Sequence, residues 1–232
     1  VIFPDGTSKQ LTETGYVLEK HLFEQWIADS AVEEGAKLAL KHKLTSMERI
    51  EDDGTFVGWK CDGKGEMFPI RSKIVIDASG VAAVCSKFVK PDGSKPLNEK
   101  GKVVAGMQYE LAEVPTDGYL DFYIWPKYAE KGYLWMIPKC DGRANVGLVT
   151  EDRPRAKKAL DQFIEDTHFS DLSQQLPPWK TKGNPAFGGT IPISGPFENT
   201  HYDGLMLIGD AAGFTSPLFE GGSHLALKSA VF

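Results

Sequence analysis

The sequence is poor in cysteine, has no excess of basic residues and contains no long apolar run. Its three cysteines, Cys61, Cys85 and Cys140, are too far apart for a CxxC pair, so buried free thiols in a reducing compartment are expected. A net charge of −6 without any basic stripe argues against nucleic-acid binding. No stretch approaches the roughly 18 apolar residues of a membrane-spanning helix. Residues 1–6 lack the pattern of a signal peptide. The reducing compartment expected from the cysteines points to the cytoplasm.

The five histidines are scattered and have no metal-ligand spacing with one another or with a cysteine, so no metal site is expected. Only His224 lies close to a motif discussed below. Both ends of the sequence are interpreted as cuts, because residues 1–3 resemble a strand without an initial Met and residues 229–232 lie in an apparent helix without a C-cap. We therefore expect an internal piece of a longer protein.

Hydrophobic periodicity predicts a mixed chain of helices and strands. Hairpin turns are expected at residues 52–54 and 62–65, and Asp152 is expected to cap a helix that has Pro154 in its first turn. Predicted helices cover 21–34, 152–164 and a segment from about 220, and predicted strands cover 37–42, 45–50, 55–61, 66–70, 73–78, 103–111, 119–125, 133–138, 144–150, 189–193 and 205–208. This order indicates an α/β (α+β) protein.

The last thirty residues carry the strongest chemical signal. A buried strand at 205–208 runs into Gly209-Asp210-Ala211-Ala212-Gly213, and an Asp at such a strand end lies where doubly wound folds bind ligands. Small neighbours let a ligand approach the backbone, so Asp210 can accept a hydrogen bond from a ligand hydroxyl. Beyond Pro217, Gly221-Gly222 begin a helix, whose N-terminus suits a negative charge. The alternative is that Asp210 only caps a helix and the glycines only form a turn.

Residues 205–230 resemble the GD motif of FAD-dependent oxidoreductases of the p-hydroxybenzoate-hydroxylase structural class, and most of all its geranylgeranyl reductase and FixC-like branch. The resemblance implies that Asp210 contacts the ribityl chain of FAD and that Gly221-Gly222 lie against the isoalloxazine ring. The cofactor-binding residues implied here are Gly209, Asp210, Ala211, Gly213, Pro217, Gly221 and Gly222.

Two earlier segments extend the resemblance to the FAD domain. Residues 74–80, with Asp77 and Gly80, resemble the strand and Asp-Gly element that these proteins place beside FAD. Lys20 stands where the family usually has an Arg, and Phe23-Glu24 stand where it has Phe-Asp. The resemblance therefore also implies a cofactor contact for Lys20.

A third segment resembles the Tyr-x-Trp-x-Phe-Pro signature of geranylgeranyl reductases, which lies on a strand of the substrate domain. Here the signature is Tyr133-Leu134-Trp135-Met136-Ile137-Pro138, followed by residues 145–147, with Ile137 in place of Phe. Strand alternation puts Tyr133, Trp135 and Ile137 on one face as an apolar wall, which suits a pocket for a long apolar ligand. The alternative is that this wall is ordinary sheet core.

Members of this class also have a strand, a GxGxxG turn and a helix that bind the pyrophosphate of FAD. No GxGxxG occurs in the 232 residues, since Gly63-Lys64-Gly65 does not continue to a third glycine. We expect residues 1–90 to be part of an FAD-binding domain, 91–189 an antiparallel substrate cap, and 190–232 the GD-motif part of the FAD domain. The isolated chain is expected to bind FAD weakly or not at all.

The resemblance implies that reduced FAD delivers a hydride to an isoprenoid double bond of the geranylgeranyl type, the chemistry being that of the cofactor. The alternatives are a FixC-like electron-transfer flavoprotein/quinone oxidoreductase, a FAD-dependent monooxygenase or halogenase, and an inactive binding piece. The expected partners are an isoprenoid lipid or quinone and an external electron donor. The small basic face of residues 153–158 is either solvated or a peripheral contact with anionic lipid. No catalytic side chain is identified.

Overall fold

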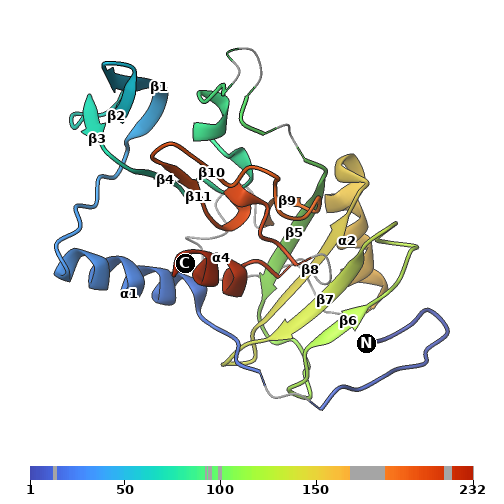
Figure 1. Cartoon of the computed structure of the whole chain (residues 1–232). Helices are drawn as coiled ribbons and strands as arrows, with labels where there is room; N and C mark the ends of the chain where they lie inside the picture. The colour runs from blue at the N-terminus through green and yellow to red at the C-terminus, as the bar shows by residue number, and fades with distance from the viewer. Residues whose placement is uncertain are drawn as a thin grey trace. The chain divides into compact units, whose positions relative to one another are not determined.

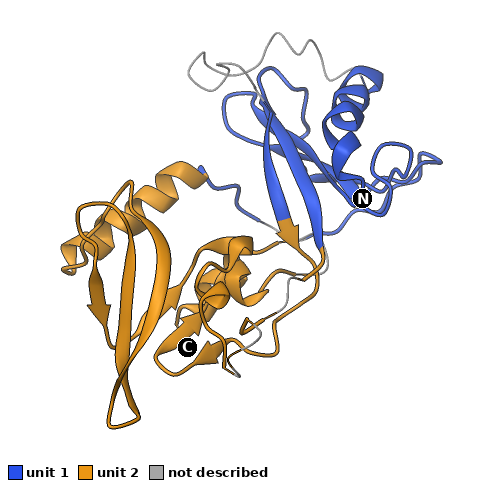
Figure 2. Ribbon diagram, turned by 90° about the horizontal axis from the view of Figure 1, so that it is seen from above, with its two compact units in different colours: residues 1–19, 103–190 blue, residues 20–102, 191–232 orange. Residues whose placement is uncertain are grey.

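The computed structural model describes residues 1–12, 15–91, 93, 96–98, 101–167, 186–216 and 221–231. The chain forms two compact units, each built from separate segments (Figure 2). Unit 1 comprises Val1–Glu19 and Val103–Thr190, and unit 2 comprises Lys20–Lys102 and Ile191–Phe232. The chain therefore passes between the units at three places.

Unit 1 is an antiparallel sheet with a helix on it (Figure 1). The sheet order is β6-β7-β8-β5-β9. The strands are β5 (Val103–Leu111), β6 (Asp121–Tyr123), β7 (Tyr133–Pro138), β8 (Ala144–Thr150) and β9 (Phe187–Pro192), of which the last two residues of β9 count with unit 2. After β8, a 3₁₀ turn at Arg153–Arg155 leads into helix α2 (Ala156–Asp166), which packs on β5 and β8.

The core of unit 1 lies between α2 and one face of this sheet. Leu134 of β7 and Val146 and Leu148 of β8 are fully buried there against Leu160 and Phe163 of α2. An aromatic cluster continues this core, because the rings of Tyr123, Trp125 and Tyr128 all meet the Phe163 ring with centroids 5.2–5.9 Å apart. The alternation of β7 therefore turns Tyr133, Trp135 and Ile137 toward the opposite face.

Two Tyr–Asp–Lys clusters attach α2 to the rest of unit 1. Tyr109 of β5 donates to Asp161 at 2.5 Å, and Lys157 donates to Tyr109 at 3.0 Å and to Asp161 at 2.8 Å. The second cluster repeats this arrangement one and a half turns further along the helix, with Tyr128 donating to Asp166 at 2.6 Å and Lys127 donating to the Asp166 carboxylate at 2.9 Å.

Unit 2 contains two small sheets, of order β1-β2-β3 and β10-β11-β4. Its strands are β1 (Lys43–Asp52), β2 (Thr55–Lys64), β3 (Ile70–Ser72), β4 (Val75–Asp77), β10 (His201–Tyr202) and β11 (Leu205–Leu207). Its helices are α1 (Lys20–Glu33) and α4 (Ser223–Ser229), with 3₁₀ turns at Gly80–Ala82, Cys85–Lys87 and Gly209–Ala212. The β4–β11 pair is parallel, which is the doubly wound element expected from the sequence.

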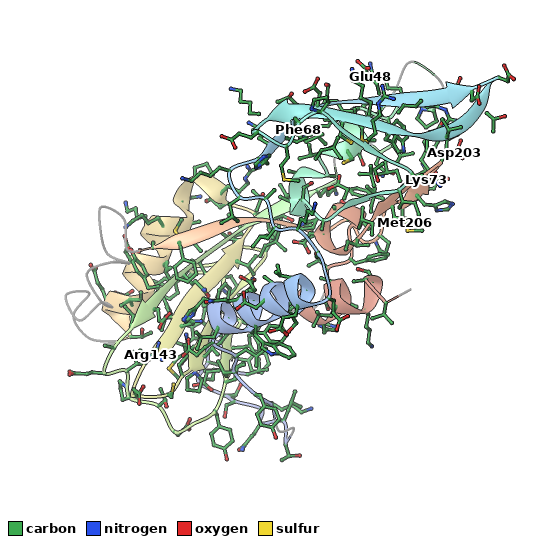
Figure 3. All side chains as sticks on the ribbon, turned by 90° about the vertical axis from the view of Figure 1, so that its left-hand side faces the viewer. Glu48, Phe68, Lys73, Arg143, Asp203 and Met206 are labelled. Atoms are coloured by element: carbon green, nitrogen blue, oxygen red, sulfur yellow. The ribbon has the colours of Figure 1, made fainter. Side chains whose placement is uncertain are left out.

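The two sheets of unit 2 are joined around Asp203, in the turn between β10 and β11 (Figure 3). Its carbonyl oxygen accepts a hydrogen bond from the indole of the buried Trp59 on β2 at 2.9 Å, and its carboxylate pairs with Arg49 of β1 at 2.8 Å. The Arg49 guanidinium also lies 4.7 Å from the centre of the Phe56 ring. These contacts fix the β1–β2 hairpin against β10–β11.

The α/β (α+β) prediction is confirmed, and several elements differ from it. Residues 37–42 form no strand, because Lys41 adopts a left-handed φ of 60° and Leu38 and Leu40 remain exposed. The predicted turn at 62–65 comes later, since β2 continues to Lys64. Asp152 makes no cap hydrogen bond, because its carboxylate binds the Arg155 side chain instead.

The units also divide the first residues differently from the predicted domains. Residues 1–19 belong with the antiparallel sheet of unit 1 and not with residues 20–90. The cause is backbone pairing, as Ile2 donates to the Phe122 carbonyl at 2.7 Å and its own carbonyl accepts from Ile124 at 3.0 Å. The chain also passes between the units after Lys102 and after Thr190, whereas the predicted domains end at residues 90 and 189.

Within the described ranges, no helix combines the length and the apolar character needed to cross a membrane.

Candidate functional site

The loop after β11 is shaped by close backbone packing. Gly209 has a φ of +56° and Gly213 a φ of +77°, both in the left-handed region that favours glycine. A Cβ on Gly213 would lie 2.3 Å from the Gly195 carbonyl oxygen, so only glycine fits there. The Gly209 amide donates to Ser229 Oγ of α4 at 2.9 Å, and Ala211 is fully buried. The small residues of the motif therefore let this loop pack against α4 and the 195–196 turn.

Asp210 is the partly exposed acidic residue of this loop. Its Oδ1 accepts a hydrogen bond from the buried Thr215 hydroxyl at 3.0 Å. The hydrogen bonds found among the described residues include none to its Oδ2. A Cβ on Gly222 would lie 3.1 Å from Asp210 Oδ1, whereas one on Gly221 would meet only His224, at 3.8 Å. The structure thus brings Asp210 and Gly222 together and leaves Gly221 open, while Pro217 lies outside the described residues.

Asp77 ends the neighbouring parallel strand β4, where it pairs with Leu207 of β11. Its side chain is buried and both carboxylate oxygens accept backbone hydrogen bonds, Oδ1 from Ser79 at 2.9 Å and Oδ2 from Cys85 at 2.7 Å. Asp77 therefore shapes the loop that follows β4. Gly80 within this loop has a φ of +66°, and a Cβ there would meet nothing within 4 Å. The loop faces open space at Gly80.

Lys20 takes no part in these contacts. It begins α1, is largely exposed and pairs with Glu24 at 3.4 Å. In the part of the chain that the structure describes, Lys20 makes no ion pair or hydrogen bond with Asp77 or Asp210. Its role in binding a cofactor stays a prediction from the motif.

The wall on β7 has the predicted alternation. Tyr133 is buried, and Trp135 and Ile137 are half-buried on the face opposite the α2 core. The Tyr133 and Trp135 rings have centroids 5.9 Å apart, and Phe122 of β6 meets Tyr133 edge-on at 5.5 Å. Pro138 ends the strand. None of the three side chains belongs to the α2 core, and Tyr133 is 8% exposed.

A cluster of four charged side chains adjoins the Ile137 end of the wall. Lys139 Nζ lies 2.7 Å from Glu19 and 3.4 Å from Glu110, and Arg143 in the β7–β8 turn (Figure 3) pairs with the same two carboxylates. The Glu110 and Lys139 side chains are almost fully buried. Hydrogen bonds from Lys139 and Arg143 hold the pKa of Glu19 below its usual value. Burial opposes the charge on Arg143, but its hydrogen bonds to Glu19 and Glu110 outweigh this and raise its pKa.

Sequence reasoning missed Glu19 and Glu110 in this cluster. The signal for Glu110 was its place in an apolar strand, where a carboxylate needs a cationic partner. The partner could not be identified, because Lys139 and Arg143 reach it through strand pairing across β8. Glu19 precedes α1 and is 120 residues from Lys139 in the sequence.

The three thiols differ in exposure. Cys61 and Cys85 are buried as expected, and burial, with the nearby Asp77 carboxylate, raises the pKa of Cys85 to about 12. Cys140 is exposed, contrary to the expectation, because it lies in the β7–β8 turn beside Arg143. In the described residues, no three His, Cys, Asp or Glu side chains gather in a way that could hold a metal ion.

Unit 2 also contains a largely apolar cavity of ≈ 450 Å³. It lies between β10–β11 and α4, with Thr200, Met206, Ile208, Phe214, Leu225 and Lys228 in its lining. None of the site residues predicted from the sequence lines this cavity.

Comparison with known proteins identifies the fold of the chain and its homologues. Residues 103–176 match the geranylgeranyl reductase catalytic domain. A digeranylgeranylglycerophospholipid reductase of Methanocaldococcus jannaschii is 34% identical over 230 residues, which cover 97% of this chain and 56% of the relative. A crystal structure of a geranylgeranyl bacteriochlorophyll reductase-like protein from Thermoplasma acidophilum has a TM-score of 0.76 and 28% identity, covering 98% of this chain and 57% of that one.

More distant solved structures share the fold. The flavin-dependent halogenase CmlS has a TM-score of 0.61 at 23% identity, covering 92% of this chain and 38% of the halogenase. The chain spans a little over half the length of the reductases that it matches. The catalytic-domain match covers β5 to α2, which includes the β7 wall, and the relatives' similarity extends over both units. The chain is a homologue of the geranylgeranyl reductases that it matches.

Proposed function

We propose that this chain forms part of an FAD-dependent reductase of isoprenoid double bonds of the geranylgeranyl type. The observation that carries the proposal is the wall of Tyr133, Trp135 and Ile137, which lies within the segment matching the catalytic domain and turns away from the α2 core. An apolar surface bounded by aromatic rings suits a long hydrocarbon chain. The chain's length relative to its relatives makes the activity a property of a longer protein.

The residues after β11 and β4 fit the binding of FAD. Asp210 Oδ2 can accept a hydrogen bond from a ribityl hydroxyl, and Thr215 orients the carboxylate. The small residues Gly209, Ala211 and Gly213 let a ligand approach the backbone of this loop closely. Gly221 and Gly222 have no side chain that would exclude a ring beside Asp210. Asp77 positions the adjoining loop that contains Gly80. When bound, FAD supplies the hydride.

The protein's own contribution is to bind the substrate and exclude water. Tyr133, Trp135 and Ile137 bind the isoprenoid chain through apolar contact, and Pro138 ends the wall at the charged cluster. The buried ion pairs of that cluster fix the end of β7 against β5. The electron donor, a peripheral membrane contact and a cytoplasmic location remain predictions.

Product analysis of the full-length protein that carries this sequence tests the proposal. The protein is supplied with a geranylgeranyl lipid and a chemical reductant, and the products are identified by mass spectrometry. We expect products that have gained H₂ at successive double bonds. Trp135→Ala should lower kcat/KM roughly tenfold to a hundredfold by removing apolar contact area. The matched control is Trp26→Ala, because Trp26 is an exposed residue of α1.

Two results would count against the proposal. One is an unchanged lipid together with a hydroxylated or halogenated product under oxygen, which indicates a monooxygenase or halogenase. The other is turnover that requires a quinone as acceptor, which indicates a FixC-like electron-transfer protein.

A further inference from the structure

Four residues form one row across the sheet of unit 1, at right angles to its strands. Strand pairing places Phe122 of β6 opposite Trp135 of β7, Trp135 opposite Gly147 of β8, and Gly147 opposite Gln108 of β5. Paired residues on neighbouring strands point to the same face. The row therefore lies on the face that carries the apolar wall.

Gly147 gives the Trp135 indole the space it occupies. A Cβ on Gly147 would lie 2.4 Å from Cζ2 and 2.6 Å from Cε2 of Trp135, closer than any real contact. Gly147 is not among the glycines with a positive φ, so its backbone conformation is open to any residue. The requirement for glycine at this position comes from the indole ring that lies over it and from Gln108, whose Cβ would lie 2.7 Å from the added Cβ.

Gln108 holds the far edge of the same ring. Its Oε1 accepts a hydrogen bond from Trp135 Nε1 at 3.3 Å, although the two residues lie on strands that are separated by β8. The indole therefore lies across β8 instead of standing away from the sheet. Without this acceptor, the N–H of a half-buried indole loses its partner, which favours another orientation of the ring.

We propose that Gln108 and Gly147 are positioning residues that hold the Trp135 indole across β8, so that the ring forms an apolar surface against which an isoprenoid chain packs. This inference rests on the proposed function for its ligand. A ring held down by Gln108 leaves the space above β8 open to the chain, whereas a ring lifted by a Cβ at position 147 occupies that space. Gln108 and Gly147 thereby set the depth of the apolar surface.

The indole N–H resonances of the chain test the positioning without any ligand. The sequence contains five tryptophans, so a ¹⁵N-correlated spectrum has up to five indole signals, and Trp135→Phe identifies the one from Trp135. We expect Gln108→Met to move this signal, because the hydrogen bond is lost, and Gln108→Glu to restore it, because a carboxylate oxygen is again in reach. Gly147→Ala should also move the signal.

Gly189→Ala is the matched control for Gly147→Ala, since a Cβ at position 189 on β9 would meet nothing within 4 Å. The remaining indole signals report whether each variant is folded. An unmoved Trp135 signal in folded Gln108→Met and Gly147→Ala would overturn the inference. An equal shift in Gly189→Ala would do the same.

A second arm measures reduction of a geranylgeranyl lipid by the full-length protein. We expect Gly147→Ala and Gln108→Met to raise KM about tenfold with a smaller effect on kcat, and Gln108→Glu to recover most of the loss. If the Trp135 signal shifts as expected but no form reduces the lipid, the proposed function fails and the positioning of the ring stands. If the lipid is reduced with unchanged KM in both variants, the role of the two residues in binding the chain is refuted.

Discussion

At the scale of single residues, Glu110 is a charged side chain in apolar surroundings. It is a nearly buried carboxylate in an apolar strand, paired with the nearly buried Lys139 at 3.4 Å and with Arg143. Two charges in such an environment are stable only together, because each one alone would lack compensation for its lost hydration. Glu110 is therefore the residue of the cluster whose loss should matter most for stability.

Replacing Glu110 with Gln removes the negative charge and keeps the size of the side chain. We expect the free energy of unfolding to fall by about 3 kcal/mol, since Lys139 and Arg143 each lose one of their two carboxylate partners, and Lys139 is nearly buried. Urea denaturation followed by circular dichroism measures the change. Lys131→Ala is the control, because its pair with Glu151 at 3.2 Å is exposed and should contribute at most about 1 kcal/mol. Equal losses in the two variants would contradict the account of the cluster.

Glu19 makes the same cluster sensitive to pH. Hydrogen bonds from Lys139 and Arg143 lower its pKa in the folded chain, so its contribution is fully present above the unfolded carboxyl pKa of about 4.3. That contribution is lost as the pH falls through the lower folded pKa. We expect the stability of the wild type to drop more steeply below about pH 5 than that of Glu19→Gln. Urea midpoints measured at a series of pH values compare the two, and parallel curves would exclude this role for Glu19.

At the scale of elements, α2 is held to the sheet by side-chain hydrogen bonds as well as by apolar packing. Tyr109 is 2% exposed and donates to the Asp161 carboxylate at 2.5 Å. Tyr109→Phe keeps the ring and should cost about 2 kcal/mol, the usual range for a hydrogen bond to a charged group. Tyr119→Phe is the control. Tyr119 is 52% exposed, so removing its hydroxyl should change the free energy of unfolding by less than about 0.5 kcal/mol. Thermal unfolding of both variants is the measurement, and a Tyr109→Phe variant as stable as the control would refute the attachment.

The elements that the sequence predicted well are those with their own strong pattern. The bounds of β5, β7 and β8 agree with the predicted runs, because each strand alternates toward the α2 core and ends at a turn residue. The predicted strand at 37–42 is wrong, because its apolar residues have no neighbouring strand and Lys41 turns the backbone. The local sequence pattern shows which secondary structure a segment favours. A strand forms only where that segment can also pair with a neighbouring strand.

The candidate site was predictable to the same extent. Asp210 and Gly222, which were both named from the motif, lie close together, and the wall residues share one face as strand alternation predicted. Gln108 could not be found, because its contact with Trp135 depends on the register of three strands. The contacts of Asp77 could not be predicted either. Its carboxylate oxygens accept hydrogen bonds from backbone amides of a loop, and the sequence does not specify the path of that loop.

At the scale of the whole molecule, the loops expected to bind the cofactor and the wall expected to bind the substrate belong to two different units. Each unit is discontinuous in sequence. Unit 2 carries the loops after β4 and β11, and unit 1 carries the apolar wall. The polar stretch around residues 91–102 was a usable signal for one passage between the units. The passage after Glu19 had no such signal, because residues 1–19 join unit 1 through backbone pairing of Ile2 and the ion pairs of Glu19.

The central claim is tested most directly by the absorbance of the purified full-length protein during anaerobic reduction and addition of a geranylgeranyl lipid. The account predicts a flavin spectrum that bleaches on reduction and recovers when the lipid is added. Asp210→Ala should lower the flavin content, because the ribityl contact is lost, whereas Asp52→Ala, at an exposed position at the end of β1, should retain it. A protein without flavin, or a reduced flavin that the lipid leaves bleached and only a quinone reoxidises, would contradict the account.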